Sequence, residues 1–199
     1  MNQQQEIQAR RRKRRRQRRL VSIAGFVLFS TGMAWFFELQ ATTTVIVVRY
    51  AEQSVLPSLD PGLSPQGRVR ASELSRVLGD VDVVAGVDAI FVAPLRSAAE
   101  TGVPLATLNN LPVHTIETPE DVEALVLRIL DEYKGKIVLV ITEPGIIQPL
   151  IAEMHGSKKL PEMVDSEHDN MYIVSIPWFG KVKTLRLRYG LPFIPDAVG

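Results

Sequence analysis

The sequence contains no cysteine. Disulfides, thiolate catalysis and cysteine-ligated metals are therefore excluded, although this absence does not distinguish a reducing from an oxidising compartment. Only three histidines are present, His114, His155 and His168, and their spacing from one another and from the acidic residues indicates no metal site. Acidic residues are scarce at the start of the chain, where only Glu6 and Glu38 precede residue 40. The compartment must therefore be inferred from topology.

Basic residues have the opposite distribution. Nine of the 23 Lys and Arg residues lie between Arg10 and Arg19. The other 14 basic residues and 20 of the 22 acidic residues lie from residue 40 onward, which gives this segment a net charge of −6. The length of 199 residues suits one domain plus an appendage. We therefore expect a basic tail over residues 1–19 and an acidic domain in different surroundings.

An uncharged stretch of 18 residues begins at Leu20 and ends at Phe37. As a helix it would span roughly 27 Å, close to the hydrocarbon thickness of a bilayer. The basic run before it favours the cytoplasmic side and attracts anionic headgroups. We predict a single-pass signal anchor over residues 20–38 in the inner (cytoplasmic) membrane. The N-terminus would be cytoplasmic and the following domain periplasmic or otherwise extracytoplasmic, with membrane lipid as a partner of the anchor and the tail.

The apolar stretch and the basic run before it each have an alternative interpretation. A cleaved signal peptide has a shorter apolar region and a small-x-small site, which the sequence from Glu38 to Ala41 fits poorly. The arginine-rich run resembles segments that bind nucleic acid through phosphates. However, it has no interleaved aromatic residues and directly adjoins the apolar stretch. We therefore favour an anchor, and we do not expect nucleic acid as a partner.

The remaining sequence alternates between strand and helix patterns. Short β-branched runs predict strands over residues 44–49, 88–92, 136–141, 171–176 and 182–188. Helix signals begin at Ser64-Pro65 and Thr118-Pro119, and two further helices are predicted over residues 95–108 and 145–155. This order predicts an α/β fold, a three-layer helix-sheet-helix sandwich with a mainly parallel sheet.

Four motifs follow the predicted strands, where such sheets bind ligands. They are VVRYAE at 47–52, LSPQG at 63–67, APLRSAAET at 93–101 and TEPG at 142–145. Together they resemble the histidine phosphatase superfamily, with its phosphoglycerate mutase-like fold, and especially its short bacterial members. The resemblance covers residues 44 to 190 and leaves residues 191–199 as a C-terminal tail.

The resemblance implies a phosphate pocket in which one histidine attacks phosphorus, while two arginines and a second histidine neutralise the phosphoryl oxygens. Arg49 matches the first arginine. Tyr50 replaces the nucleophilic histidine, Ser97 the second arginine and Glu143 the second histidine, and Arg96 falls at a variable position beside Ser97. We therefore expect a degenerate pocket with no catalytic residue, no metal and no cofactor.

The altered positions lead to a specific hypothesis about charge. Tyr50 is a poor nucleophile at neutral pH, because a phenol has a pKa near 10. Arg49 and Glu143 should end adjacent strands and form an ion pair that closes the pocket to phosphate. In the simpler alternative, Arg49 caps a strand end and Glu143 is solvated. None of the three histidines matches a motif position, and each is interpreted as a surface or helix-terminal residue.

Three functions remain open. The first is a membrane-anchored, non-enzymatic binding or scaffold module, a pseudoenzyme that recognises an unknown protein or small ligand. The second is a phosphoric monoester hydrolase with a rewired active site. The third makes the basic tail the working part, with the domain inert. Fold alone does not decide among them.

Overall fold

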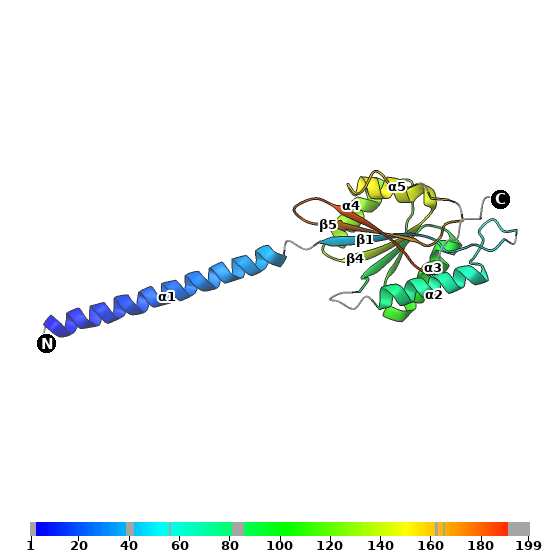
Figure 1. Cartoon of the computed structure of the whole chain (residues 1–199). Coiled ribbons are helices and arrows are strands. Elements are labelled where there is room, and N and C mark those ends of the chain that lie inside the picture. Colours follow the sequence, from blue (N-terminus) through cyan, green and yellow to red (C-terminus); the bar gives the residue numbers. More distant parts are fainter. Residues whose placement is uncertain are drawn as a thin grey trace. The chain divides into compact units, whose positions relative to one another are not determined.

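The computed structural model describes residues 3–38, 42–55, 57–80, 86–161, 163–164 and 166–190 (Figure 1). The chain divides into two compact units, Met1–Gln40 and Ala41–Gly199. The predicted C-terminal tail over residues 191–199 lies outside the described residues.

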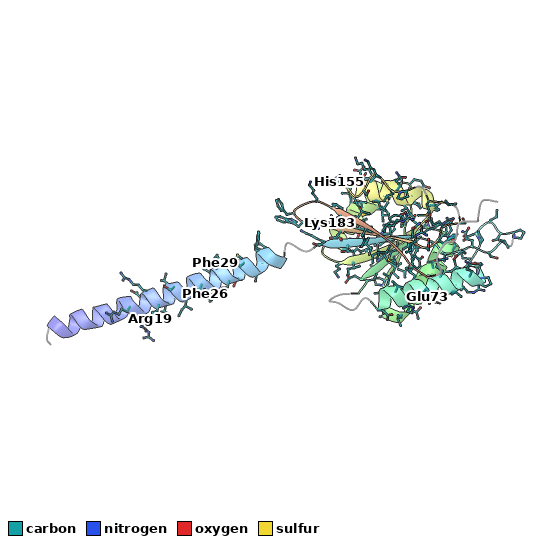
Figure 2. All side chains as sticks on the ribbon, in the orientation of Figure 1. Arg19, Phe26, Phe29, Glu73, His155 and Lys183 are labelled. Atoms are coloured by element: carbon teal, nitrogen blue, oxygen red, sulfur yellow. The ribbon has the colours of Figure 1, made fainter. Side chains whose placement is uncertain are left out.

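The first unit contains a single helix, α1 (Gln3–Glu38), which holds the basic run and the apolar stretch without a break. Its segment Arg15–Phe36 is long and apolar enough to cross a membrane. Between Leu20 and Phe36 of α1, large apolar side chains such as Phe26 and Phe29 are exposed (Figure 2). An apolar surface on every side is typical of a helix surrounded by lipid or by a protein core.

The second unit is built on a six-stranded sheet in the order β3-β2-β4-β1-β5-β6. Strand β1 pairs in parallel with β4, β4 with β2, and β2 with β3, whereas β5 and β6 add an antiparallel edge. All five predicted strands are present, with ends shifted by one residue at most, and the short strand around His114 is β3. The bounds are β1 (Thr43–Arg49), β2 (Ala89–Val92), β3 (Val113–Thr115), β4 (Ile137–Thr142), β5 (Asn170–Ile176) and β6 (Lys183–Arg188).

Helices α2 (Pro65–Gly79), α3 (Arg96–Asn109) and α4 (Val122–Glu132) connect the parallel strands, and α5 (Pro144–Glu153) connects β4 to the antiparallel strand β5. The Ser64 hydroxyl caps α2 as predicted, by accepting a hydrogen bond of 3.0 Å from the backbone N–H of Gly67. The predicted start of α4 at Thr118-Pro119 is wrong. Those residues form a turn, and the Asp121 carboxylate caps the helix by accepting from the backbone N–H of Ala124.

Two apolar cores lie on opposite faces of the sheet, because successive strand residues point to opposite sides. Val45 and Val47 belong to the core under α4 and α5, whereas Ile46 and Val48 belong to the core under α2 and α3. Figure 1 shows α5 and α4 above the sheet and α2 and α3 below it. The predicted three-layer sandwich is confirmed. The carboxyl ends of β1, β2 and β4 meet at one edge of the sheet, and this edge holds the candidate site.

Candidate functional site

Arg49 is the last residue of β1, and it is paired in register with Thr142, the last residue of β4. Glu143 follows immediately, so Arg49 and Glu143 end adjacent parallel strands, as expected. The Arg49 side chain is largely buried, and its guanidinium lies over the neighbouring Tyr50 ring, 5.5 Å from the ring centroid. The Tyr50 ring therefore packs against the arginine.

The expected Arg49–Glu143 ion pair is not found. Among the described residues, the pairs within 4.0 Å join other side chains. Glu143 is partly exposed at the N-cap position of α5, and its side chain makes no capping hydrogen bond there. The reason is geometric: Glu143 leaves the strand to start a helix, so register with β1 extends only to Thr142. A carboxylate still stands where the resemblance implies a phosphate-facing histidine.

Ser97, at the position of the missing arginine, is completely buried in the first turn of α3. Its hydroxyl accepts a hydrogen bond of 2.9 Å from the side-chain amide of Gln53. An arginine at this position would have to displace Gln53. The space that a second guanidinium would occupy is therefore filled by a contact between two neutral side chains.

Thr101, the final threonine of the same motif, is fully buried and ties α3 to the segment after β1. Its hydroxyl accepts from the backbone N–H of Ala51 at 3.0 Å and donates to the backbone carbonyl of Ser97 at 2.7 Å. Gly67, in the LSPQG motif, lies against the segment that follows β1. A Cβ atom added at Gly67 would clash with the backbone oxygen of Glu52. These motif residues hold the backbone, independently of any phosphate chemistry.

Arg96 lies near the site in sequence but is turned outward. Its guanidinium pairs with Glu100 at 2.7 Å, and its backbone N–H donates to the carboxylate of Asp60. Glu100 also accepts from the backbone N–H of Leu63, and this bond, together with the Arg96 charge, lowers the pKa of Glu100. Arg96 is therefore engaged in holding the loop after β1 and does not replace the missing phosphate-binding arginine.

A buried ion pair between Glu52 and Arg70 lies beneath the site. Arg70 is almost fully buried, and its guanidinium contacts the Glu52 carboxylate through Nη2 at 2.7 Å and through Nε at 2.8 Å. It also donates to the backbone carbonyl of Tyr189. Burial favours the neutral acid, but the Arg70 hydrogen bond and charge outweigh it, so the pKa of Glu52 is lowered. The pair fixes α2 to the segment that follows β1.

His168 enters the site from the segment before β5, and sequence reasoning missed it. Its Nδ1 lies 3.0 Å from the backbone carbonyl oxygen of Tyr50. A carbonyl only accepts, so Nδ1 carries the proton and Nε2 keeps its lone pair when the ring is neutral. Burial, and to a lesser extent the charge of Arg49, lower the pKa of His168, which favours that neutral form. The acidic sequence around His168 gave no signal, because 118 residues separate it from Tyr50.

The other two histidines lie away from the site. His155 is helix-terminal as expected, whereas the interpretation of His114 as a surface or helix-terminal residue is wrong, because it is half-buried on β3 against Phe91. The Nε2 atom of His114 is 2.7 Å from the hydroxyl of Tyr133, beneath α4. His155 is exposed just after α5, in a left-handed backbone conformation with φ of 57°. Within the described part of the chain, no group of three His, Asp or Glu side chains could hold a metal ion.

A cavity of about 600 Å³ adjoins the site between the loop after β1, α2 and α3. Apolar side chains, including Leu63 and Val103, form part of its wall, together with Arg68, Arg96 and Glu100. The Arg68 guanidinium donates to the backbone carbonyl of Leu63. This hollow is large enough for a small ligand or for a side chain of a partner protein.

Comparison with known proteins places these features in context. No family model and no curated protein matches the sequence. Among solved structures, the chain is similar to the protein histidine phosphatase SixA in complex with tungstate, with a TM-score of 0.59 and 18% identity over 73% of this chain and 96% of that one. The domain has the histidine phosphatase fold.

Two other solved structures are similar to the domain as well. A phosphoserine phosphatase from Entamoeba histolytica matches with a TM-score of 0.53 and 15% identity, covering 75% of this chain and 98% of that one. A mycobacterial glucosyl-3-phosphoglycerate phosphatase matches with a TM-score of 0.52 and 17% identity, covering 67% of this chain and 90% of that one. The predicted resemblance and fold are thus confirmed.

Proposed function

We propose that this protein is a membrane-anchored, catalytically inactive member of the histidine phosphatase fold that works as a binding or scaffold module. One observation carries the proposal: the motif residues that hold the backbone are kept, whereas three of the four pocket groups that would hold or attack phosphate are replaced and only Arg49 remains. Ser64, Gly67 and Thr101 each have a structural contact. At the phosphate-facing positions, Ser97 is neutral and bonded to Gln53, and Glu143 is acidic.

The electrostatic reason is simple. A phosphate group carries nearly two negative charges at neutral pH, and buried charge needs partners of opposite sign. Arg49 offers a much weaker positive field than two arginines and two histidines would, and Glu143 adds a negative charge at the same edge of the sheet. Loss of that field removes both affinity for the substrate and stabilisation of the transition state.

Inactivity is tested with the full chain in detergent, using an aryl phosphate and, as a binding probe, tungstate. We expect no turnover and no tungstate binding. The variant Tyr50→His, Ser97→Arg, Glu143→His, with Gln53→Ala to make room, should gain tungstate affinity. Tungstate bound beside Arg49 in the unmodified protein would contradict the proposal.

A rewired phosphatase is the second candidate, and the position of His168 favours it. Its Nδ1–H is held by the Tyr50 carbonyl, so Nε2 would be the nucleophilic atom, close to the positive charge of Arg49. In this case the unmodified protein would hydrolyse the aryl phosphate, and both His168→Ala and Arg49→Ala would abolish turnover. His155→Ala, an exposed histidine remote from the site, is the matched control.

Membrane anchoring is the second part of the proposal, supported by the length and composition of α1. We place the basic tail in the cytoplasm and the domain on the extracytoplasmic side of the inner membrane. Because the protein lacks cysteine, single introduced thiols report topology without background. A membrane-impermeant maleimide should label Glu120→Cys in intact cells and should label Gln8→Cys only after the membrane is opened. The reverse pattern would refute this orientation.

The proposed ligand is a protein or a small molecule that occupies the cavity beside the degenerate pocket. Val103 is exposed on its wall, so Val103→Trp should fill the space without disturbing the core. Affinity capture from detergent-solubilised membranes should lose specific partners in this variant. Leu127→Trp, at an exposed position on α4, is the control and should keep them.

A further inference from the structure

Two exposed aromatic side chains mark the tip of the β5-β6 hairpin. Trp178 is 55% exposed and Phe179 is 86% exposed, and both lie in the turn that joins the two strands. Gly180 has a φ of 119°, a conformation that glycine adopts readily and that turns the chain here. The hairpin therefore presents two large aromatic rings to the solvent.

The strand register places this hairpin tip beside the start of β1. Thr43, the first residue of β1, is paired with Ile176, the last residue of β5, and the turn follows directly. Lys183 begins β6 opposite Ser175. Figure 2 shows Lys183 at this end of the sheet, opposite the edge that holds the candidate site.

All six lysines beyond residue 40 lie at or near this same end, and all are exposed. Two lie in the hairpin region, and two precede β4, whose first residue pairs with Thr44. The other two follow Ser157, whose backbone N–H donates to the hydroxyl of Thr184 near the start of β6. The six lysines are Lys134, Lys136, Lys158, Lys159, Lys181 and Lys183. Lys136 has an acidic neighbour, Asp88, at 3.9 Å.

The connection between the apolar stretch and β1 is short. Only four residues separate Glu38, the last residue of α1, from Thr43. Fully extended, that connection spans roughly 17 Å. If α1 crosses a bilayer, the start of β1, and with it the hairpin beside Thr43, cannot be far from the membrane surface.

We propose that the hairpin tip, residues 177–183, is a membrane-contact site that rests on the bilayer crossed by α1. Trp178 and Phe179 enter the interfacial layer, where aromatic rings are favoured, and Lys181 and Lys183 reach lipid phosphates through their flexible stems. The occupant is the phospholipid surface. The contact would hold the domain in one orientation, with the degenerate pocket and its cavity facing away from the membrane. This inference rests on the proposed anchoring.

The experiment uses the full chain in vesicles of equal parts phosphatidylcholine and phosphatidylglycerol, with or without brominated acyl chains that quench tryptophan. The chain has two tryptophans, Trp35 in α1 and Trp178 in the hairpin. In Trp35→Phe, emission comes from Trp178 alone, and in Trp178→Phe it comes from Trp35 alone. The first variant tests the hairpin contact and the second tests the anchor.

We expect brominated lipid to quench the emission of Trp178. In vesicles without bromine, the emission maximum of Trp178 should lie at shorter wavelength than that of the domain released by proteolysis into detergent-free buffer. Lys181→Glu with Lys183→Glu, added to Trp35→Phe, should reduce this quenching. The matched control carries Trp35→Phe, Trp178→Phe and Leu59→Trp, because Leu59 is exposed in the loop at the opposite edge of the sheet. Its tryptophan should stay unquenched.

The outcomes separate the two ideas. Quenching of Trp35 without quenching of Trp178 overturns the hairpin contact and leaves the anchor intact. Absence of quenching at Trp35 overturns the anchor itself. Equal quenching of Trp178 and of the control tryptophan at position 59 also overturns the proposal, because the domain would then meet the membrane without a preferred face.

Discussion

The buried ion pair between Glu52 and Arg70 should contribute measurably to stability. We consider Glu52→Gln, which keeps the shape of the side chain but removes its charge. The almost fully buried Arg70 would lose its carboxylate while keeping its hydrogen bond to the Tyr189 carbonyl. Removing one partner of a buried pair costs 3–5 kcal/mol, and because the Glu52 side chain is 17% exposed we expect about 2 to 3 kcal/mol.

The assay is denaturant unfolding of the full chain in detergent, followed by Trp178 fluorescence in a Trp35→Phe background. The matched control is Glu73→Gln, which removes an exposed ion pair between Glu73 and Arg76 on α2. Exposed pairs contribute about 0.2–1 kcal/mol, so the control should change little. If Glu52→Gln is no more destabilising than Glu73→Gln, the structural role assigned to the buried pair is wrong.

The same pair predicts a pH dependence. The pKa of Glu52 is lowered in the folded protein, so its contribution is present above the unfolded pKa and is lost as pH falls through the folded pKa. Stability should therefore decrease below about pH 4.5, and less steeply in Glu52→Gln than in the unmodified protein. If the stability of the two proteins decreases equally steeply at acidic pH, the Glu52–Arg70 pair does not cause this pH dependence.

Three further predictions concern the site. Gly67→Ala should destabilise the domain by several kcal/mol, about 3 or more, because its Cβ would meet the backbone oxygen of Glu52, whereas Gly145→Ala, with open space around the added Cβ, should be nearly neutral in the same unfolding assay. Thr101→Val should cost about 1–3 kcal/mol, because it leaves the buried N–H of Ala51 without its acceptor, and thermal unfolding would measure this loss. Burial lowers the pKa of His168, so its neutral form contributes stability that is fully present above about pH 6.5 and is lost as pH falls through the folded pKa. His168→Gln should therefore flatten the pH dependence of stability below about pH 6.5, and an unchanged profile would refute this.

The sequence by itself determined the secondary structure and the class of fold. Apolar β-branched runs such as Thr43–Arg49 form strands wherever both faces of a sheet are buried, and the Ser64 cap with Pro65 marks the start of α2. These signals are local, because the pattern and the structure it specifies occupy the same residues. Where two local cap signals competed, as at Thr118 and Asp121, the choice was wrong by one turn.

The sequence also predicts the composition of the degenerate pocket, because motif position points to Tyr50, Ser97 and Glu143, and this assignment stays a prediction. The sequence did not predict what those residues contact. The partner of Ser97 is Gln53, 44 residues away, and Glu143 begins a helix and makes no ion pair with Arg49 among the described residues. Such pairings depend on how loops from different strands pack, and single-residue patterns do not encode this.

Tertiary structure alone decided two features. It brought His168 to the carbonyl of Tyr50 across 118 residues, next to the position where the fold's nucleophile would stand. It also gathered Trp178 and the exposed lysines at the end of the sheet where β1 begins. Antiparallel pairing of β5 with β1 positions His168 and Trp178, and parallel pairing of β4 with β1 brings Lys134 and Lys136 to the same end as Trp178. These are long-range contacts that depend on the packing of the whole sheet. The sequence specified which residues form strands, and the closed core specified which of them became neighbours.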